Sequence, residues 1–444
     1  MTDVSRLRAV LRGAGRTAGR PAGQVRTAPI DLEALASGLG GGLEDAPLGP
    51  CPVVRWWVGE RDGVDDGVAD AEGSVDDDPY GDQIAQASRA ISERGLRTLC
   101  GAPAAAEPPW SGPHPTDGLL FFDLETTGLS GGSGTVAFVV GFGRFEGSRF
   151  HVWQFVLPSF AGERRLLAAV TAAVSRAHTL VTFNGKSFDV PFMEMRWLYH
   201  RLETPLPALR HVDLLHPGRR LWGPDTGGLG GLERRVIQFQ RRGDVPGCEI
   251  PSRYFDYLRS GDPSPIREVL SHNRLDLASL AVLTGQACAL VDGGPDVTNG
   301  ARQCLGLGRV YARGGRPAEA NGCYERAAGL TSGAGRAWRG AGDPDVRVEA
   351  LYRAASTRRR LRRHDEAAQV WQALLDLGRA PGLFEREALS ALAVHHEHRL
   401  KDTQRALTLT RRAYAVERAA YRRRAVQKRL TRLERRMAEE TKPA

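Results

Sequence analysis

From residue 119 onward, short apolar segments typical of buried strands alternate with amphipathic segments typical of helices. The expected strands cover 119–124, 135–145, 149–157 and 179–183, and the expected helices cover 163–177, 191–201 and 266–290. A meander of three strands followed by helix, strand and helix predicts an α/β fold, a mixed sheet with helices packed on its faces. This succession excludes an all-helical or all-β fold for the central part of the chain.

Beyond residue 298 the pattern becomes all-helical and partly repetitive. Residues 319–327 align with 366–374, and a looser copy surrounds Ala406. The spacing of small and aromatic residues resembles tetratricopeptide helix pairs, although separations of about 47 and about 38 residues depart from that repeat's period of ~34. A plain helical bundle is the alternative. The arginine-rich segment 421–436 is expected to form a basic, exposed or capping helix.

Four regions are expected along the chain. Residues 1–45 are rich in Gly, Ala and Arg and predict a poorly ordered segment with at most a short helix. Residues 46–114 form an N-terminal extension with a strand at 53–58 and an acidic loop at 62–78. The α/β domain is expected at 115–292 and the helical domain at 298–444.

The charge is unevenly distributed between these regions. The chain carries 61 Lys and Arg against 52 Asp and Glu, a net charge of +9, and basic residues outnumber acidic ones mainly after residue 300. A basic region joined to an acidic one is expected where one part attracts a polyanion and the other holds a metal. The alternative is a set of solvated arginine-rich helix faces.

The sequence shows no membrane-length apolar run and no apolar block of a signal peptide near its start. We therefore expect a soluble, cytoplasmic protein with no membrane partner. The six cysteines are scattered without a CxxC pair, which argues against a zinc site and a disulfide framework.

Two carboxylates mark the end of the first strand of the α/β domain. Asp123 and Glu125 are two residues apart, so both side chains point to the same side of the sheet. Such acids repel one another unless cations lie between them, and oxygen ligands favour Mg²⁺ or Mn²⁺. The alternative is an exposed acid pair beside the turn that follows.

Two further clusters follow in the chain. An apolar strand is followed by Asn184, Lys186 and Asp189, at a strand end where α/β domains place their ligands. A helix N-cap would also explain the acid at position 189. His272 and Asp276 are four residues apart, one turn of a helix, so that the acid can hold a metal while the histidine acts as a base. A buried, hydrogen-bonded histidine is the alternative.

Taken in order, these clusters resemble the three motifs of the DEDD exonucleases, which belong to the ribonuclease-H-like superfamily. The segments that carry the resemblance are FDLETTGL at 122–129, FNGKSFD at 183–189 and HNRLD at 272–276. Within that superfamily the chain resembles the bacterial YprB-like family, to which HVDLLHP at 211–217 and DVPGCEIP at 244–251 also point. The resemblance covers about residues 115–290.

The resemblance implies a ribonuclease-H-like fold and a two-metal-ion site that takes Mg²⁺ or Mn²⁺. The implied metal ligands are Asp123, Glu125, Asp189 and Asp276, and His272 would take the place of the general base.

The resemblance also implies contacts with nucleic acid, which we expect from Thr126, Asn184, Lys186 and Asn273. One departure concerns the base, because the superfamily's histidine subclass has one more residue between its histidine and acid, and its tyrosine subclass has the spacing seen here. Tyr254 and Tyr257 therefore stay open as contributors.

The leading functional hypothesis is a metal-dependent nuclease, a 3′ to 5′ exonuclease on single-stranded DNA or RNA, with the basic helical region holding phosphates. One alternative is a non-catalytic nucleic-acid-binding or scaffold protein whose helical repeats recruit a protein partner. Another is a structure-specific endonuclease with the same metal chemistry.

Overall fold

A computed structural model was used to describe the fold of the chain. It describes residues 30–59, 80–101, 114–128, 134–224, 227–331, 344–378 and 382–440. The acidic loop expected at 62–78 and most of the N-terminal segment lie outside these residues.

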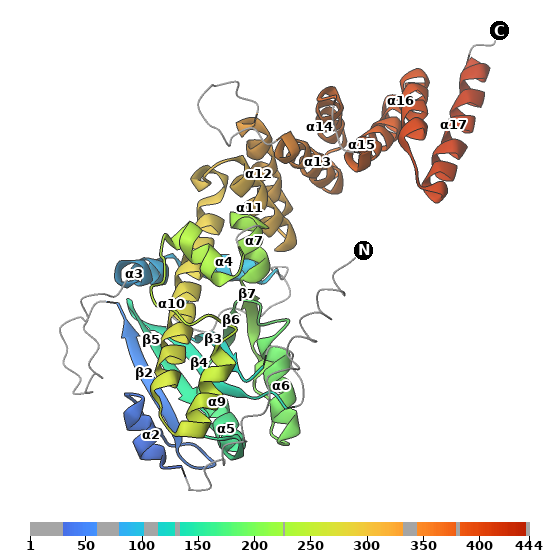
Figure 1. The fold of residues 1–444 in the computed structure, drawn as a ribbon. Coiled ribbons are helices and arrows are strands. Elements are labelled where there is room, and N and C mark those ends of the chain that lie inside the picture. Colours follow the sequence, from blue (N-terminus) through green and yellow to red (C-terminus); the bar gives the residue numbers. More distant parts are fainter. Residues whose placement is uncertain are drawn as a thin grey trace.

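The first part of the described chain is built on one seven-stranded mixed sheet, drawn in blue and green in Figure 1. Its strand order is β1-β2-β5-β4-β3-β6-β7. The parallel pairs are β3 with β6 and β6 with β7, and the other neighbours are antiparallel. The strands are β1 (Gly42–Glu44), β2 (Cys51–Val58), β3 (Leu119–Thr126), β4 (Ala137–Glu146), β5 (Arg149–Val156), β6 (Thr179–Thr182) and β7 (Arg210–Asp213).

Helices cover both faces of this sheet. On one face α3, α4 and the long α10 pack together, and α10 also contacts β3 and β4. On the other face the apolar sides of α5 and α6 pack against the same sheet. The helices of this part are α2 (Leu32–Gly38), α3 (Gly81–Ala90), α4 (Glu93–Cys100), α5 (Glu163–Val174), α6 (Asp189–Tyr199), α7 (Leu215–Trp222), α8 (Leu229–Leu232), α9 (Ile250–Ser260) and α10 (Ser264–Gly293).

β3 illustrates how the sequence pattern assigns each side chain to a face. Leu120, Phe122 and Leu124 belong to the hydrophobic core with α5 and α6. Leu119 and Phe121 belong to the core with α10. Because side chains alternate along a strand, the odd-numbered residues that follow also face α10.

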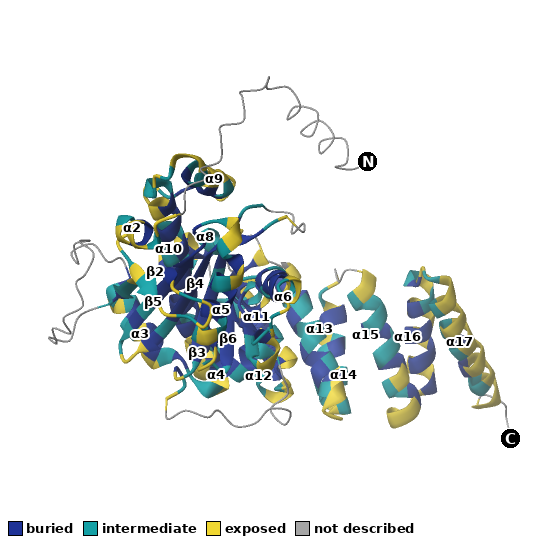
Figure 2. Ribbon diagram, turned by 90° about the horizontal axis from the view of Figure 1, so that it is seen from below, coloured by how far each residue is buried: buried dark blue, intermediate teal, exposed yellow. Residues whose placement is uncertain are grey.

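The second part of the chain is an array of helices in which successive members pack side by side, extending away from the sheet (Figure 1). Its helices are α11 (Ala301–Arg313), α12 (Pro317–Leu330), α13 (Pro344–Arg360), α14 (His364–Asp376), α15 (Gly382–His395), α16 (Thr403–Val416) and α17 (Ala420–Glu440). In Figure 2 the sheet is dark blue, and α17 is exposed along much of its length. The basic helix expected near residues 421–436 is therefore present.

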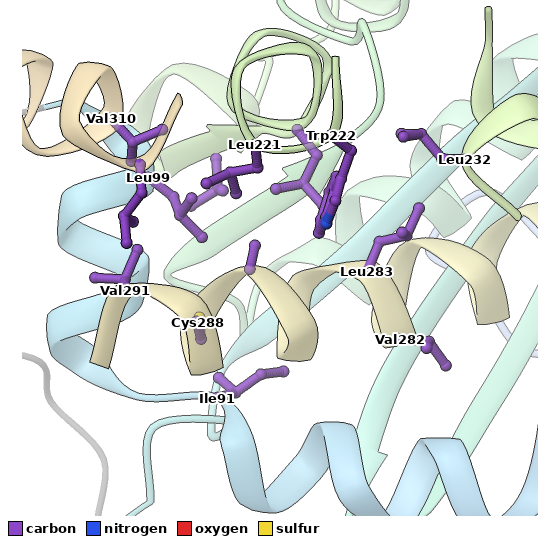
Figure 3. Close-up of a cluster of buried hydrophobic side chains, with 14 of the residues drawn as sticks. Ile91, Leu99, Leu221, Trp222, Leu232, Val282, Leu283, Cys288, Val291 and Val310 are labelled. Carbon is purple, nitrogen blue, oxygen red and sulfur yellow. The ribbon is translucent and has the colours of Figure 1, made fainter. Parts of the chain in front are cut away.

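The two parts share one hydrophobic core. Figure 3 shows Leu283 and Val291 of α10 and Leu99 of α4 in one cluster with Leu221 of α7 and Val310 of α11. The first helix of the array is therefore packed directly on the sheet domain.

The segment Ser264–Val297, which contains α10, is long and apolar enough to cross a membrane. Its most apolar window is 67% buried inside the protein. In this structure the helix is the central core helix between the sheet and the array, which accounts for its composition.

The expected fold class is confirmed: a mixed sheet with flanking helices precedes a helical region. The strand expected at 53–58 is present as β2 and pairs with β5, so this part of the N-terminal extension continues the sheet. The short strands β1 and β7 were not expected from the sequence pattern.

Candidate active site

Asp123 and Glu125 project from the end of β3 toward α10. Glu125 is buried, whereas Asp123 keeps a partly exposed side chain. The β3–β4 register shifts between Glu125 and Thr126, which ends regular pairing just beyond the acids. The strand thus delivers both carboxylates to one place at the border of the core.

Asp123 is held by a buried amide from α10. Asn273 donates from Nδ2 to Asp123 Oδ2 at 2.7 Å, and its own Oδ1 accepts from Gln154 Nε2 at 2.8 Å. Gly141 pairs with Asp123 in the neighbouring strand, and a Cβ added there would lie 2.0 Å from Asn273 Oδ1. Glycine at this position therefore gives Asn273 the room to reach Asp123.

α10 brings two more candidate residues to the same place. One ligand atom from each of Glu125, His272 and Asp276 lies within 4.8 Å of the others, an arrangement that could hold a metal ion. The helical step of four residues therefore places both His272 and Asp276 near Glu125.

Asp189 approaches from α6, which begins at this residue. The N-cap position is Phe188 and makes no side-chain cap, so Asp189 is not the N-cap that sequence reasoning had left open. Burial raises the pKa of Asp189 to about 7, with further contributions from the charges of Asp213 and Asp276. Asp189 is therefore close enough to α10 for the charge of Asp276 to raise its pKa.

The loop before α6 is fixed by Asp213 at the end of β7. Its carboxylate accepts from the backbone N–H groups of Asn184, Lys186 and Leu215 at 2.8, 3.0 and 3.0 Å. Asn184 has a φ of 71°, in the left-handed region that asparagine tolerates better than most residues. Asp213 is thus a supporting residue, and only the HVDLLHP segment signalled it in the sequence.

Burial disfavours the ionisation of all four acids, and for Asp123, Glu125 and Asp189 the charges of neighbouring acids add to this effect. Burial raises the pKa of Asp123 well above its ordinary value, and Asp276 and Asp189 raise it further. Burial likewise raises the pKa of Glu125, with Asp123 next in importance. Burial raises the pKa of Asp276, although the Arg241 charge opposes this shift. A cluster of this kind is stabilised by added positive charge.

Part of that positive charge comes from Arg241, which sequence reasoning missed. Its guanidinium forms ion pairs with Glu233, Asp244 and Asp276, and the distance from Nη1 to Asp244 is 3.0 Å. Asp244 also lies 2.7 Å from His272 Nδ1. Asp244 lay in a segment noted for the family resemblance, but no local pattern marked Arg241.

The residues expected to contact nucleic acid differ in accessibility. Lys186 is exposed, and Asn184 is partly exposed. Thr126 is buried, and its hydroxyl donates to the Gly128 carbonyl at 2.9 Å. Asn273 is fully buried and bonded to Asp123 and Gln154, so we assign it to supporting Asp123 instead of contacting a substrate.

The two tyrosines left open by the sequence lie apart from the acids. The Tyr254 ring stacks on Phe138 at 4.5 Å, and the Tyr257 hydroxyl donates to the Pro158 carbonyl at 3.1 Å. Both belong to the core that contains Leu124, which faces away from Asp123. Of the three candidates, His272 is the one that the structure places beside the acids.

The donor set fits a divalent cation with a preference for oxygen. The converging carboxylates supply oxygen ligands, as Mg²⁺ and Mn²⁺ require, and cysteine is absent from the three-residue group around Glu125. Asp123 and Asp276 are partly exposed. The residues present are therefore suited to metal binding.

Comparison with known proteins agrees with this arrangement. Residues 120–288 match a model of the RNase_H superfamily, and this segment contains all four acids. The chain is also similar to the uncharacterized protein YprB of Bacillus subtilis (strain 168), with 39% identity over 168 residues. That match covers 37% of this chain and 40% of the relative, so the chain spans well under two thirds of the relative's length. The sheet domain is thus similar to ribonuclease-H-like domains, in agreement with its fold.

Proposed function

We propose that this ribonuclease-H-like domain is a metal-dependent nuclease that hydrolyses phosphodiester bonds of DNA or RNA. The observation that carries the proposal is the convergence of Asp123, Glu125, Asp189 and Asp276 from β3, α6 and α10. The raised pKa values of these carboxylates mean that the site gains stability when cations bind. A purely structural acid cluster would have no reason to bury such repulsion.

The four acids are the proposed ligands of two Mg²⁺ or Mn²⁺ ions. When bound, such ions activate a water molecule and stabilise the leaving oxygen during an in-line displacement at phosphorus. Within the chain, Asn273 fixes the orientation of Asp123 through its 2.7 Å hydrogen bond. His272 directs Nε2 toward Asp276, at 3.6 Å, and is the proposed base that accepts a proton from water.

We further propose that the enzyme is a 3′ to 5′ exonuclease of the DEDD type acting on single strands in the cytoplasm. The resemblance of the three motifs supports this polarity. The exposed Lys186, in the loop 184–186, offers a positive charge to a phosphate. The helical array, with its excess of basic residues, would hold the remaining strand through phosphates. A tetratricopeptide-like role in recruiting a protein partner is the alternative use of the array.

The direct test is digestion of labelled DNA and RNA oligonucleotides by the full chain in Mn²⁺, in Mg²⁺ and in EDTA. Cleavage is expected only with metal, and Asp123→Asn is expected to reduce it more than about 100-fold because it removes a charged ligand. Asp256→Asn is the matched control, since Asp256 lies on α9 and pairs on the surface with Arg259.

The outcomes separate the competing functions. Equal cleavage by wild type and Asp123→Asn would refute the assigned site. Salt-sensitive binding without metal-dependent cleavage would favour a non-catalytic binding protein. Degradation of oligonucleotides with blocked 3′ ends would favour endonuclease action over a 3′ exonuclease.

A further inference from the structure

We propose that Asp244 is a positioning residue that orients the His272 imidazole toward the metal site. This inference rests on the proposed function and assigns a role to a residue outside the four acids. Asp244 lies in the loop 238–249, between the π-helical turn η5 (Glu233–Ile237) and α9. It reaches His272 from a different element of the chain, 28 residues earlier.

The contact fixes which ring nitrogen faces the acids. Asp244 Oδ1 lies 2.7 Å from His272 Nδ1, while His272 Nε2 lies 3.6 Å from Asp276 Oδ2. Arg241 Nη1, which can only donate, also lies 3.4 Å from Nδ1, but the Asp244 oxygen is the nearer partner. With the Asp244 carboxylate accepting the proton of Nδ1, the neutral ring carries its free lone pair on Nε2. That lone pair then faces Asp276, which belongs with His272 and Glu125 to the group that could hold a metal ion.

Asp244 is itself held in place by a chain of buried and partly buried contacts. Its second oxygen, Oδ2, accepts from Arg241 Nη1 at 3.0 Å, and Arg241 is anchored by an ion pair to Glu233. Glu233 is buried and accepts from the Ser279 hydroxyl of α10 at 2.5 Å. The loop is thus tied back to the helix that carries His272, so the carboxylate can hold the ring in one orientation.

The competing explanation is that Asp244 only fastens the loop to α10. In that case its removal would disturb the site in the same way whether or not the histidine is present. An orienting role makes a different demand, because the contribution of Asp244 must then act through His272. A double-mutant cycle and a direct observation of the ring separate the two explanations.

The kinetic experiment compares Asp244→Ala and Asp244→Asn with wild type on a single-stranded oligonucleotide in Mn²⁺. Asp244→Ala is expected to lower kcat about 10- to 100-fold, as loss of a supporting partner does in metal sites. Asparagine can still accept from Nδ1 and is expected to restore part of that loss. Asp256→Ala on the surface of α9 is the matched control and is expected to keep wild-type kcat.

The double-mutant cycle also measures the effect of Asp244→Ala in a His272→Ala background. There Asp244→Ala is expected to change kcat less than about 2-fold, because no ring remains to be oriented. An equal fold-loss in both backgrounds would overturn the proposal and leave the loop-fastening explanation.

The second readout does not depend on activity. Nitrogen-15 NMR of the full chain, labelled with nitrogen-15 at its histidines and measured in Mg²⁺, reports which ring nitrogen is protonated. The signal of His272 among the 11 histidines is the one that disappears in His272→Ala. The Nδ1–H form is expected in wild type and its loss in Asp244→Ala; an unchanged ring signal would overturn the inference. If wild type cleaves no oligonucleotide, the proposed function fails, while this measurement still decides whether Asp244 orients the ring.

Discussion

Replacing Asp189 with asparagine is expected to stabilise the metal-free protein above neutral pH, although it removes a proposed metal ligand. Asp189 is buried, and its pKa is raised from 3.8 to about 7 by burial and then by the charge of Asp213. Because the folded state binds this proton more tightly than the unfolded chain does, the contribution of Asp189 to the free energy of unfolding is greatest below pH 4. It falls as the pH rises toward 7 and then stays constant.

The magnitude follows from the shift. A shift of about 3 pKa units corresponds to about 4 kcal/mol, which is the upper limit for the cost at pH 8. Between pH 5 and pH 8 the cost grows by roughly 3 kcal/mol. Asparagine avoids the cost but loses a negative charge in the first turn of α6, a favourable position that contributes about 0.3–1 kcal/mol. The net gain expected at pH 8 is therefore about 3 kcal/mol.

The assay is thermal and urea unfolding of wild type and Asp189→Asn in EDTA at pH 5 and pH 8. The advantage of the variant is expected to be larger at pH 8, and excess Mn²⁺ is expected to reverse the order by stabilising wild type preferentially. Asp256→Asn, a surface change on α9, should stay within about 0.5 kcal/mol of wild type at both pH values. A variant less stable than wild type at pH 8 without metal, or a difference independent of pH, would refute the reasoning.

Three further predictions concern the supports of the site and the charge of the array. Gly141→Ala is expected to cost about 1–3 kcal/mol in thermal unfolding and to abolish metal-dependent cleavage, because the new Cβ displaces Asn273, whereas Gly322→Ala, with nothing within 4 Å, should be harmless. Asp213→Asn is expected to cost about 1–3 kcal/mol and to slow cleavage, because it weakens the acceptor of the backbone donors in loop 184–186; unchanged stability would contradict this. The logarithm of the association constant for an oligonucleotide, measured by fluorescence anisotropy, should fall linearly with the logarithm of the salt concentration. A flat dependence would exclude phosphate contacts.

The core of the site was predictable because its signals are local. The apolar run before Asp123 predicts a buried strand, and the spacing to Glu125 fixes a common side. The helical step between His272 and Asp276 likewise follows from local periodicity. The convergence of the three clusters was expected from their order and resemblance, because no local rule brings residues of such different sequence position together.

The remaining features depend on long-range packing that a local pattern does not encode. Arg241 forms an ion pair with Asp276, which lies 35 residues further along the chain. The loop that carries Arg241 has no sequence periodicity from which this contact could be predicted. The strand character of β2 is local, but its pairing with β5 is set by the assembled sheet. The resemblance implied a substrate contact for Asn273, whereas its complete burial and its hydrogen bonds to Asp123 and Gln154 show that its amide turns inward.

Arg241 also explains how the chain tolerates so many acids before metal binds. Its guanidinium is shared among Glu233, Asp244 and Asp276. A buried charge left without a partner costs about 3–5 kcal/mol, so an arginine paired with Asp276 alone would resist the arrival of an ion. In the proposed metal-bound state Arg241 would keep its ion pairs with Glu233 and Asp244, so that neither Arg241 nor Asp276 would be left unpaired. Under the proposed metal binding, the shared pairing would let Asp276 exchange the Arg241 guanidinium for a metal ion without releasing the loop that holds His272.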